Sequence, residues 1–285
     1  MKAGRAHALA APLLLATALA LAGCGGSATP ASQTSNGGGT AGNWPAPQDQ
    51  TFQGCPPQGD GGDAQLNIRK NRTDTGDWQP ETVGNIVNLQ YPADVGKQRR
   101  ANWSSADATA VAQSEGRPLQ VEGYLLLVRH EGPESPNCHD PNQRDFHMWL
   151  SGSPGTSADR AASMIVEVAP RVRALNAGWQ PDSRLLGLAG RHVRISGWLM
   201  LDQEHPEQVG KTRGTLWEIH PVLKIEVDQG GQWVNLNDTS LGINGGSPNT
   251  TSNGSSGSGS YSSGSHSSRS HSSRSHRKHP RSSGG

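Results

Sequence analysis

The chain is short of apolar residues and of catalytic signatures. Only 32% of its 285 residues are hydrophobic, and Gly, Pro, Ser and Asn crowd both ends. The folded part is therefore expected to be one domain in the middle of the chain. There is no nucleophile elbow, P-loop, dinucleotide fingerprint, paired CxxC or HExxH motif, which argues against several enzyme classes. The one long apolar run, residues 8–21, is too short for an ordinary spanning helix.

The N-terminal region has the layout of a secretory signal. Lys2 and Arg5 precede the apolar run, and Leu21-Ala22-Gly23-Cys24 follows it. The tetrapeptide resembles the lipobox of bacterial lipoproteins. The resemblance implies a signal peptide over residues 1–23 and two or three acyl chains on Cys24, enough to hold a protein on a bilayer. The expected location is the bacterial cell envelope, facing the periplasm or the outside. The alternative is an ordinary secretion signal with an incidental cysteine.

Two low-complexity segments are expected to be disordered, because they cannot bury enough apolar area to fold. Residues 24–50 form a flexible tether, and residues 238–285 form a Gly/Ser/His/Arg tail. Its histidines His266, His271 and His276 recur with period five, and no Asp or Glu occurs after residue 240. Such a tail either binds metal ions or anions or serves only as solvated chain.

Charge and cysteine are both distributed unevenly. The formal net charge is +1, but with the signal and tail set aside 18 basic residues face 24 acidic ones, a balance near −6. This disfavours nucleic acid as a partner, since phosphate neutralisation supplies most of that affinity.

Once Cys24 is lipidated, Cys55 and Cys138 remain. In an oxidising compartment the pair predicts a disulfide, worth about 4 kcal/mol in the chain-entropy model; the alternative is two separate thiols.

Five strands are predicted from apolar runs and period-two alternation. They cover residues 119–130, 145–150, 164–168, 192–201 and 215–227, with a short edge strand near Trp233 and a broken helical region at 170–190. Three strands, a helix and two strands follow the order of an oligonucleotide/oligosaccharide-binding (OB) barrel. The sequence therefore predicts a mainly β fold, a five-stranded OB-like barrel over residues 117–237 with a helix between its third and fourth strands.

The segment before the barrel, residues 51–116, is expected to wrap over it. In residues 66–72 the apolar side chains are expected to pack, while Arg69, Lys70 and Arg72 stay outside. Residues 81–100 are expected to be extended. A helix is predicted over residues 106–115, capped by Ser104 or Ser105. Three arginines of the barrel region are also expected to be exposed: Arg171, Arg173 and Arg213.

Short motifs are spread over residues 64–228. They are Lys70-Asn71-Arg72, Pro133-Glu-Ser-Pro-Asn-Cys-His139, Asp145-Phe-His147, Met164-Ile-Val-Glu167, Ile195-Ser-Gly-Trp198-Leu-Met-Leu-Asp202, His205 and Thr215-Leu-Trp-Glu218-Ile-His220-Pro221-Val. With these motifs the chain resembles a family of uncharacterised secreted bacterial proteins with OB-like folds. The resemblance implies the fold and brings no activity.

Polar side chains from three strands are expected to meet on one wall of the barrel. Alternation places Asp145, His147 and Trp149 on one face of the second strand, and Glu218 with His220 on one face of the fifth. Glu167 interrupts the apolar third strand, which in an OB barrel pairs with both of the others. The apolar residues that alternate with these side chains are expected to fill the barrel: Phe146, Met148, Leu150, Met164, Val166, Val168, Trp217 and Ile219.

Three interpretations of this face stay open. In the first, His147, Glu167 and His220 bind a divalent metal ion, with Asp145, Glu218 or His205 as extra ligands or their partners, in a hydrolase such as a phosphodiesterase. In the second, Trp149 and Trp198 stack on a ligand while His and Glu side chains hydrogen-bond to it. In the third, the face is a structural network sealed beneath residues 66–72. His205 follows the fourth strand, at a common ligand edge of OB barrels.

The sequence favours a membrane-anchored binding or interaction module over an enzyme. Its expected partners are the membrane, through the lipid, and an envelope glycan, peptide or protein. Only the first interpretation involves a cofactor, which is the divalent metal ion. The metal-dependent hydrolase is the alternative function.

Replacing Cys24 tests the anchor. Cys24→Ser removes the only acylation site in the lipobox-like motif, so the protein should move from the membrane fraction to the soluble fraction. Fractionation of expressing cells and immunoblotting measure this, with Cys55→Ser as the cysteine control that should stay on the membrane. Retention of the Cys24→Ser protein on membranes would contradict the lipoprotein prediction.

Overall fold

The computed structural model describes residues 50–243. Cys24 and the predicted signal peptide, tether and most of the predicted tail lie outside the described residues, so those predictions stay predictions. Within the described part, no helix is long and apolar enough to cross a membrane.

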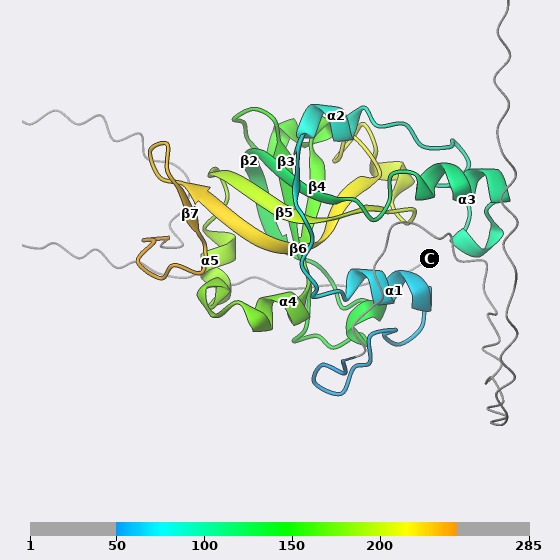
Figure 1. Ribbon diagram of the computed structural model, residues 1–285, viewed down its shortest axis with the longest axis horizontal. Coiled ribbons are helices and arrows are strands. Elements are labelled where there is room, and N and C mark those ends of the chain that lie inside the picture. The colour runs from blue at the N-terminus through cyan, green and yellow to red at the C-terminus, as the bar shows by residue number, and fades with distance from the viewer. Residues whose placement is uncertain (1–49, 244–285) are drawn as a thin grey trace, which may run out of the picture.

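Five strands close a barrel, with bounds near those predicted (Figure 1). They are β2 (Pro118–His130), β3 (Phe146–Ser151), β4 (Met164–Val168), β5 (His192–Leu201) and β6 (Trp217–Asp228). β2 pairs with β3 and β5, β3 with β4, and β5 with β6, all antiparallel; β4 pairs with β6 in parallel. The ring β2-β3-β4-β6-β5 closes on itself, which confirms the mainly β, OB-like prediction. β1 (Gln79–Thr82) extends β2, and β7 (Trp233–Asn235) extends β6.

Apolar alternation fills this barrel as predicted. The inward sets of β3, β4 and β6 belong to one core cluster, each residue at most 1% exposed: Phe146, Met148, Leu150, Met164, Val166, Val168, Trp217 and Ile219. Gly123 lies in the middle of the long β2. A Cβ there would sit 2.4 Å from the backbone oxygen of Ser151, so glycine lets β2 and the end of β3 approach closely.

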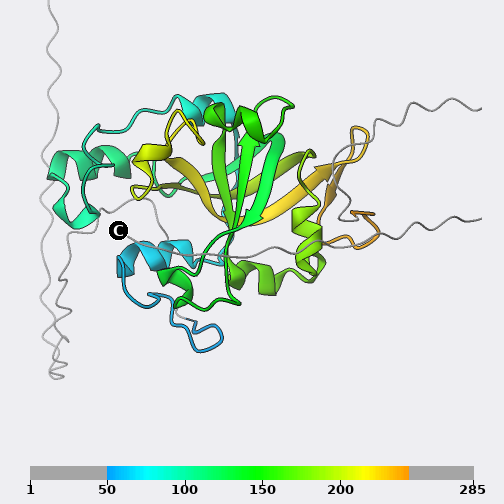
Figure 2. The same cartoon turned by 180° about the vertical axis from the view of Figure 1, so that it is seen from behind.

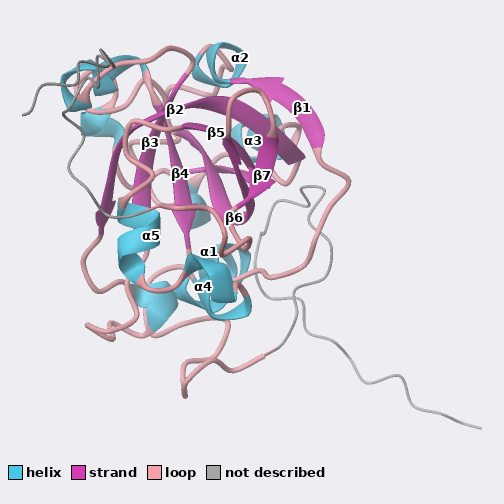
Figure 3. Ribbon diagram, turned by 90° about the vertical axis from the view of Figure 1, so that its left-hand side faces the viewer, coloured by secondary structure: helices cyan, strands magenta, loops and turns pink. Residues whose placement is uncertain are grey.

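The predicted helical region between β4 and β5 is broken into short pieces. α4 (Pro170–Leu175) starts at a proline, a 3-10 turn follows at Ala177–Trp179, and α5 (Asp182–Leu186) comes next. Gly190, with φ of +81°, ends the region. Figure 3 shows α4 and α5, together with α1 (Ala64–Lys70), gathered at one end of the barrel.

The first part of the wrapping segment corrects one prediction. Residues 66–72 lie mostly in α1, which Asp63 caps by accepting two backbone hydrogen bonds. Lys70 and Arg72 were expected outside but are 6% and 2% exposed. Arg72 is buried because Asp74 pairs with it. Lys70 is buried because acidic groups surround it, including Glu167, Glu134 and Glu218.

The second part of the wrapping segment is more helical than predicted. Residues 81–100 contain α2 (Val83–Val87), whose first turn is capped by Thr82 at 3.1 Å from the Asn85 N–H. α3 (Ser105–Ala112) has Ser104 as its cap. It ends before the predicted residue 115, and the Glu115 side chain lies in the interior, paired with Arg69 and Arg100. Seen from the front and from behind, α1 and α2 lie on opposite sides of the barrel (Figures 1 and 2).

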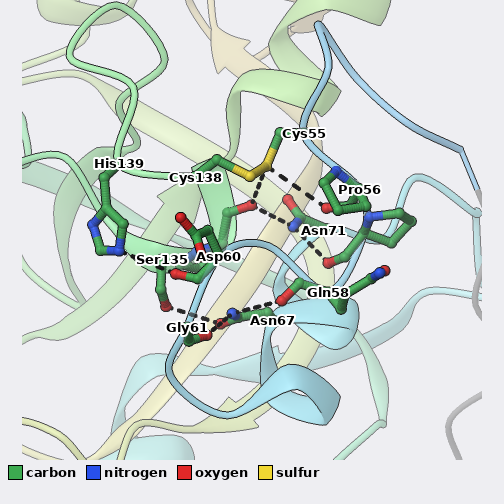
Figure 4. Close-up of a disulfide and its surroundings, with 12 residues drawn as sticks. Cys55, Pro56, Gln58, Asp60, Gly61, Asn67, Asn71, Ser135, Cys138 and His139 are labelled. Atoms are coloured by element: carbon green, nitrogen blue, oxygen red, sulfur yellow. Dashed lines mark hydrogen bonds between the residues drawn. A yellow bond between two sulfur atoms is a disulfide. The ribbon is translucent and has the colours of Figure 1, made fainter.

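Residues 50–72, here called the strap, are fastened to the loop between β2 and β3. The predicted disulfide between Cys55 and Cys138 is present. The side-chain amide of Asn71 donates to the carbonyls of Pro57 and Pro136, at 2.9 and 2.8 Å. The amide of Asn67 donates to Gln58 and Gly61 (Figure 4). Side-chain amides thus replace the ladder hydrogen bonds that this Gly- and Pro-rich segment lacks.

The folded part extends past the predicted boundary at residue 237. Leu241 and Ile243 are 6% and 7% exposed and join the core. Arg184 of α5 holds this segment by donating to the carbonyls of Leu236, Asp238 and Leu241, at 3.0 to 3.1 Å. Apolar burial and a multidentate arginine therefore order a stretch that looks low in complexity.

Leu241→Ala tests this extension. Truncating a buried leucine should lower the free energy of unfolding by about 3 kcal/mol, measured by urea denaturation. Leu175→Ala is the matched control, because Leu175 is 69% exposed and the same change there should stay within about 0.5 kcal/mol. Equal effects of the two substitutions would contradict the packing of the C-terminal segment.

Candidate functional site

The polar residues predicted from three strands converge on the outer wall of the barrel. Asp145, His147, Glu167, Glu218 and His220, here called the wall cluster, are between 0% and 6% exposed. The sheet register brings them together: His147 is opposite Glu167, and Ile165 is opposite Glu218. They alternate with the core residues, and α1 packs against β6 beside them. The wall cluster is therefore a buried polar layer outside the barrel core.

Glu167 is the centre of the wall cluster. One carboxylate oxygen pairs with Nε2 of His147, and the other lies 3.0 Å from Nδ1 of His220. Nδ1 of His147 lies 3.0 Å from Glu131. His220 also has Glu218 Oε1 at 3.4 Å from Nδ1 and Asp145 Oδ2 at 3.6 Å from Nε2. Acid and imidazole groups thus alternate across the wall.

Arg213 and Lys70, which were predicted to be exposed, complete the network together with His205, which was predicted at a ligand edge. Nη1 of Arg213, a residue 1% exposed, lies 2.6 Å from Asp202 Oδ2 and 3.7 Å from Glu218 Oε2. Nδ1 of His205 lies 2.7 Å from the same Asp202 oxygen. The ion pair of Lys70 is with Glu204, at 3.5 Å. Lys70 and Asp202 lie in two of the short motifs, which could have indicated their part in the site. Arg213 lies in none of these motifs, so the sequence did not indicate its role.

Arg171 and Arg173 are also buried rather than exposed, each 6% accessible. Arg171 donates to the carbonyl of Cys55 at 2.6 Å. Arg173 lies 3.7 Å from Asp182 and covers the ring of Phe146. Both arginines therefore hold the α4 region to its neighbours.

The charges of the wall cluster set one another's pKa values. Burial lowers the pKa of His220, but the interactions with Glu167, Glu218 and Asp145 together outweigh it and raise the pKa to about 10. Burial raises the pKa of Glu167, yet His147 and His220 hold it well below its usual range. Burial raises the pKa of Asp145 and of Glu218, and the nearby Glu167 charge raises both further. Glu167 is thus the firmly ionised acid.

Glu134 joins the edge of this network from the loop between β2 and β3. Burial, with the charges of Glu167 and Asp145, raises the pKa of Glu134 to about 7. Sequence reasoning did not single out this residue, although it lies in the motif that ends at His139.

The donor atoms define a different metal set from the predicted one. One ligand atom each of Asp145, Glu167 and His220 lie within 4.8 Å of one another. His147 is instead held between Glu131 and Glu167. Asp145, which was predicted as an accessory, thus takes the place of His147 in the set that converges.

The two tryptophans predicted to stack on a ligand are buried. Trp149 is 2% exposed, packs on Leu126 and Ile165, and donates from Nε1 to the Thr212 carbonyl at 2.6 Å. Trp198 is 3% exposed and has the Arg72 guanidinium over its ring at 4.2 Å. Arginine and backbone groups occupy the places a ligand would take, so the structure corrects the predicted stacking role.

A groove lies away from the wall cluster, between α2, residues 88–92 and α3. Its volume is about 710 Å³. Its lining combines apolar and aromatic side chains with amides and one ion pair: Glu81, Asn85, Ile86, Asn88, Leu89, Gln90, Tyr91, Pro92, Ala110, Gln113, Ser114 and Arg117. This size is within the range of small-molecule sites.

Fold and geometry define the chain as an OB-like barrel with a buried acid–imidazole cluster on its wall. Comparison with protein-family models, curated proteins and solved structures gives no match. The resemblance to a secreted bacterial family therefore stays a prediction.

His205 gives a prediction about pH. The hydrogen bond to Asp202 raises the pKa of His205, so its pairing stabilises the fold fully below pH 6.5, the unfolded value. This contribution is lost as the pH rises through the higher folded pKa. His205→Gln should lower the free energy of unfolding by about 0.5 kcal/mol at pH 5.5 and less at pH 9, measured by urea denaturation.

The matched control is the same substitution in an Asp202→Asn background, where the partner charge is gone. There His205→Gln should have an effect that does not change between the two pH values. A pH-dependent effect that persists in this background would show that Asp202 is not the cause.

Proposed function

We propose that the chain is a membrane-anchored binding module of the bacterial cell envelope that takes a neutral polar ligand in the groove beside α2 and α3. The observation that carries this proposal is the groove itself. The groove is open, its volume is about 710 Å³, and it is lined by both apolar and hydrogen-bonding side chains. That composition is typical of sites that recognise small ligands.

The side chains of the groove favour a glycan over a charged ligand. The lining includes the partly buried Tyr91 and exposed amides at Asn85, Asn88, Gln90 and Gln113. Amides both donate and accept hydrogen bonds, as sugar hydroxyls do, and an aromatic ring packs against the apolar face of a sugar.

The charged residues of the groove agree with a neutral ligand. At one end the Arg117 guanidinium lies 3.6 Å from the Glu81 carboxylate, so the two charges largely offset each other. An envelope glycan fits this chemistry, with a neutral peptide as the competing ligand.

The envelope location rests on two independent features. The lipobox-like motif ends at Cys24, ahead of the described domain. The disulfide between Cys55 and Cys138 belongs to proteins of oxidising compartments. Both are consistent with a lipid-anchored domain that faces the periplasm or the outside.

A metal-dependent hydrolase using the His147, Glu167 and His220 face is the second candidate. The contacts of Glu167 with both imidazoles favour it. It ranks second because a catalytic metal needs an open position for water and substrate, and these three side chains are at most 6% exposed.

Gln113→Ala tests the ligand groove. Removing one exposed amide from the lining should weaken binding of a neutral N-acetylglucosamine oligosaccharide by about fivefold to tenfold, the worth of one hydrogen bond. Isothermal titration calorimetry measures the affinity. Gln229→Ala removes an exposed amide outside the groove and should leave it unchanged. Equal affinities of all three proteins, or binding only of a neutral peptide, would contradict the glycan proposal.

A further inference from the structure

Several polar atoms in the middle of the wall cluster have no hydrogen bond. They are Asp145 Oδ2, Glu167 Oε2, both oxygens of Glu218 and both ring nitrogens of His220. His220 is 0% exposed and Glu167 is 3% exposed, so bulk solvent does not reach these atoms. Buried polar atoms normally find partners, because leaving them unpaired is costly.

The distances around His220 make this more specific. Its Nδ1 lies 3.0 Å from Glu167 Oε2 and its Nε2 lies 3.6 Å from Asp145 Oδ2, close enough for contact. Neither contact is a hydrogen bond, and the second is too long to be one. Carboxylate oxygens and imidazole nitrogens that lie this close together without hydrogen bonds between them are typical of the ligands of a metal ion.

The type of the donor atoms agrees with a metal ion. Asp145 and Glu167 supply carboxylate oxygens and His220 supplies an imidazole nitrogen, and the three atoms lie within 4.8 Å of one another. This set suits a first-row divalent ion such as Zn²⁺ or Mn²⁺. Glu218, with Oε1 at 3.4 Å from His220 Nδ1, is placed to add a fourth ligand.

We infer that Asp145, Glu167 and His220 form a buried site for one divalent transition-metal ion. Three different segments supply its ligands: the residue before β3, β4 and β6. A bound ion therefore joins β3, β4 and β6. This inference does not depend on the proposed groove, which lies elsewhere.

The surroundings make the site structural rather than catalytic. Asp145 is further fixed by Asn137, whose side-chain amide donates to Oδ1 at 2.8 Å. Asn137 precedes Cys138, whose disulfide with Cys55 ties this loop to the strap and so helps to hold Asp145 in place. α1 packs against β6 beside the site. The ion is therefore expected to exchange slowly in the oxidised protein.

Bound metal in the full-length protein tests the site directly. The four tail histidines, His266, His271, His276 and His279, are replaced by serine to remove competing ligands. The purified protein is incubated with Zn²⁺ or Mn²⁺, washed with chelator, and measured by inductively coupled plasma mass spectrometry. We expect about one ion per chain. No retained ion, together with a melting temperature unchanged by either metal or chelator, would overturn the inference.

Asp145→Asn and Asp202→Asn then separate a ligand from a structural acid. Both residues are buried and paired with cations, but only Asp145 belongs to the metal set. In the tail-substituted protein, Asp145→Asn should reduce the bound ion at least tenfold, whereas Asp202→Asn should retain it. Retention of the ion by folded Asp145→Asn protein would overturn the assignment.

A spectroscopic measurement keeps the test decisive if Asp145→Asn does not fold. The tail-substituted protein is refolded with Co²⁺ in place of the other metals. A buried nitrogen and oxygen ligand set should give intense d–d absorption bands that oxygen-bound Co²⁺ in water lacks. A spectrum matching aqueous Co²⁺ would exclude the site. Glycan binding to the groove, measured on the same protein, should be the same with and without metal.

Discussion

Burial of charged side chains outside the barrel core is the constraint on which this structure depends. Glu167 is 3% exposed, and an isolated carboxylate at that depth would cost several kcal/mol. Its two flanking imidazoles make its ionised form the stable one. The same solution recurs at Glu115, which is fully buried between Arg69 and Arg100 and also accepts the Leu201 N–H at 3.0 Å. At Glu115 the acid and both cations come from the wrapping segment, whereas at Glu167 the acid and both imidazoles come from the barrel.

The strap is explained by this constraint. Charged pairs are strong only where water is kept away from them, and a five-stranded barrel alone would leave its outer wall wet. α1 lies against β6, and the disulfide with the amides of Asn67 and Asn71 fastens it there. Hydrogen bonds from the Asn71 side chain to Pro136 and from the Asp60 N–H to the Ser135 carbonyl join the strap to the loop between β2 and β3. Its low apolar content does not prevent order, because the wall cluster beneath it provides the attraction.

Alternation of apolar residues made most of the fold predictable. β4 and β5 have the predicted bounds, and barrel order alone brought Glu167 beside His147 and His220. The failures share a physical cause. Lys70 and Arg213 are types usually exposed, and only the acids gathered by the fold make their burial favourable. Trp198 is buried beneath Arg72, which comes from the strap. Leu241 and Ile243 stand among Gly, Ser and Asn, so no local pattern marked them as core.

The wall cluster also has a consequence for how the chain reaches its native state. Its members come from residue 145 to residue 220, and Lys70 of the strap lies near them. β4 and β6 pair in parallel although they are distant in sequence. A partial chain that ends before β6 has Glu167 without His220 and Arg213 without Glu218. In such an intermediate, charged side chains lack their partners, so early collapse adds little stability. Folding of the barrel and docking of the strap should therefore be a single cooperative event, limited by closure of the last strand.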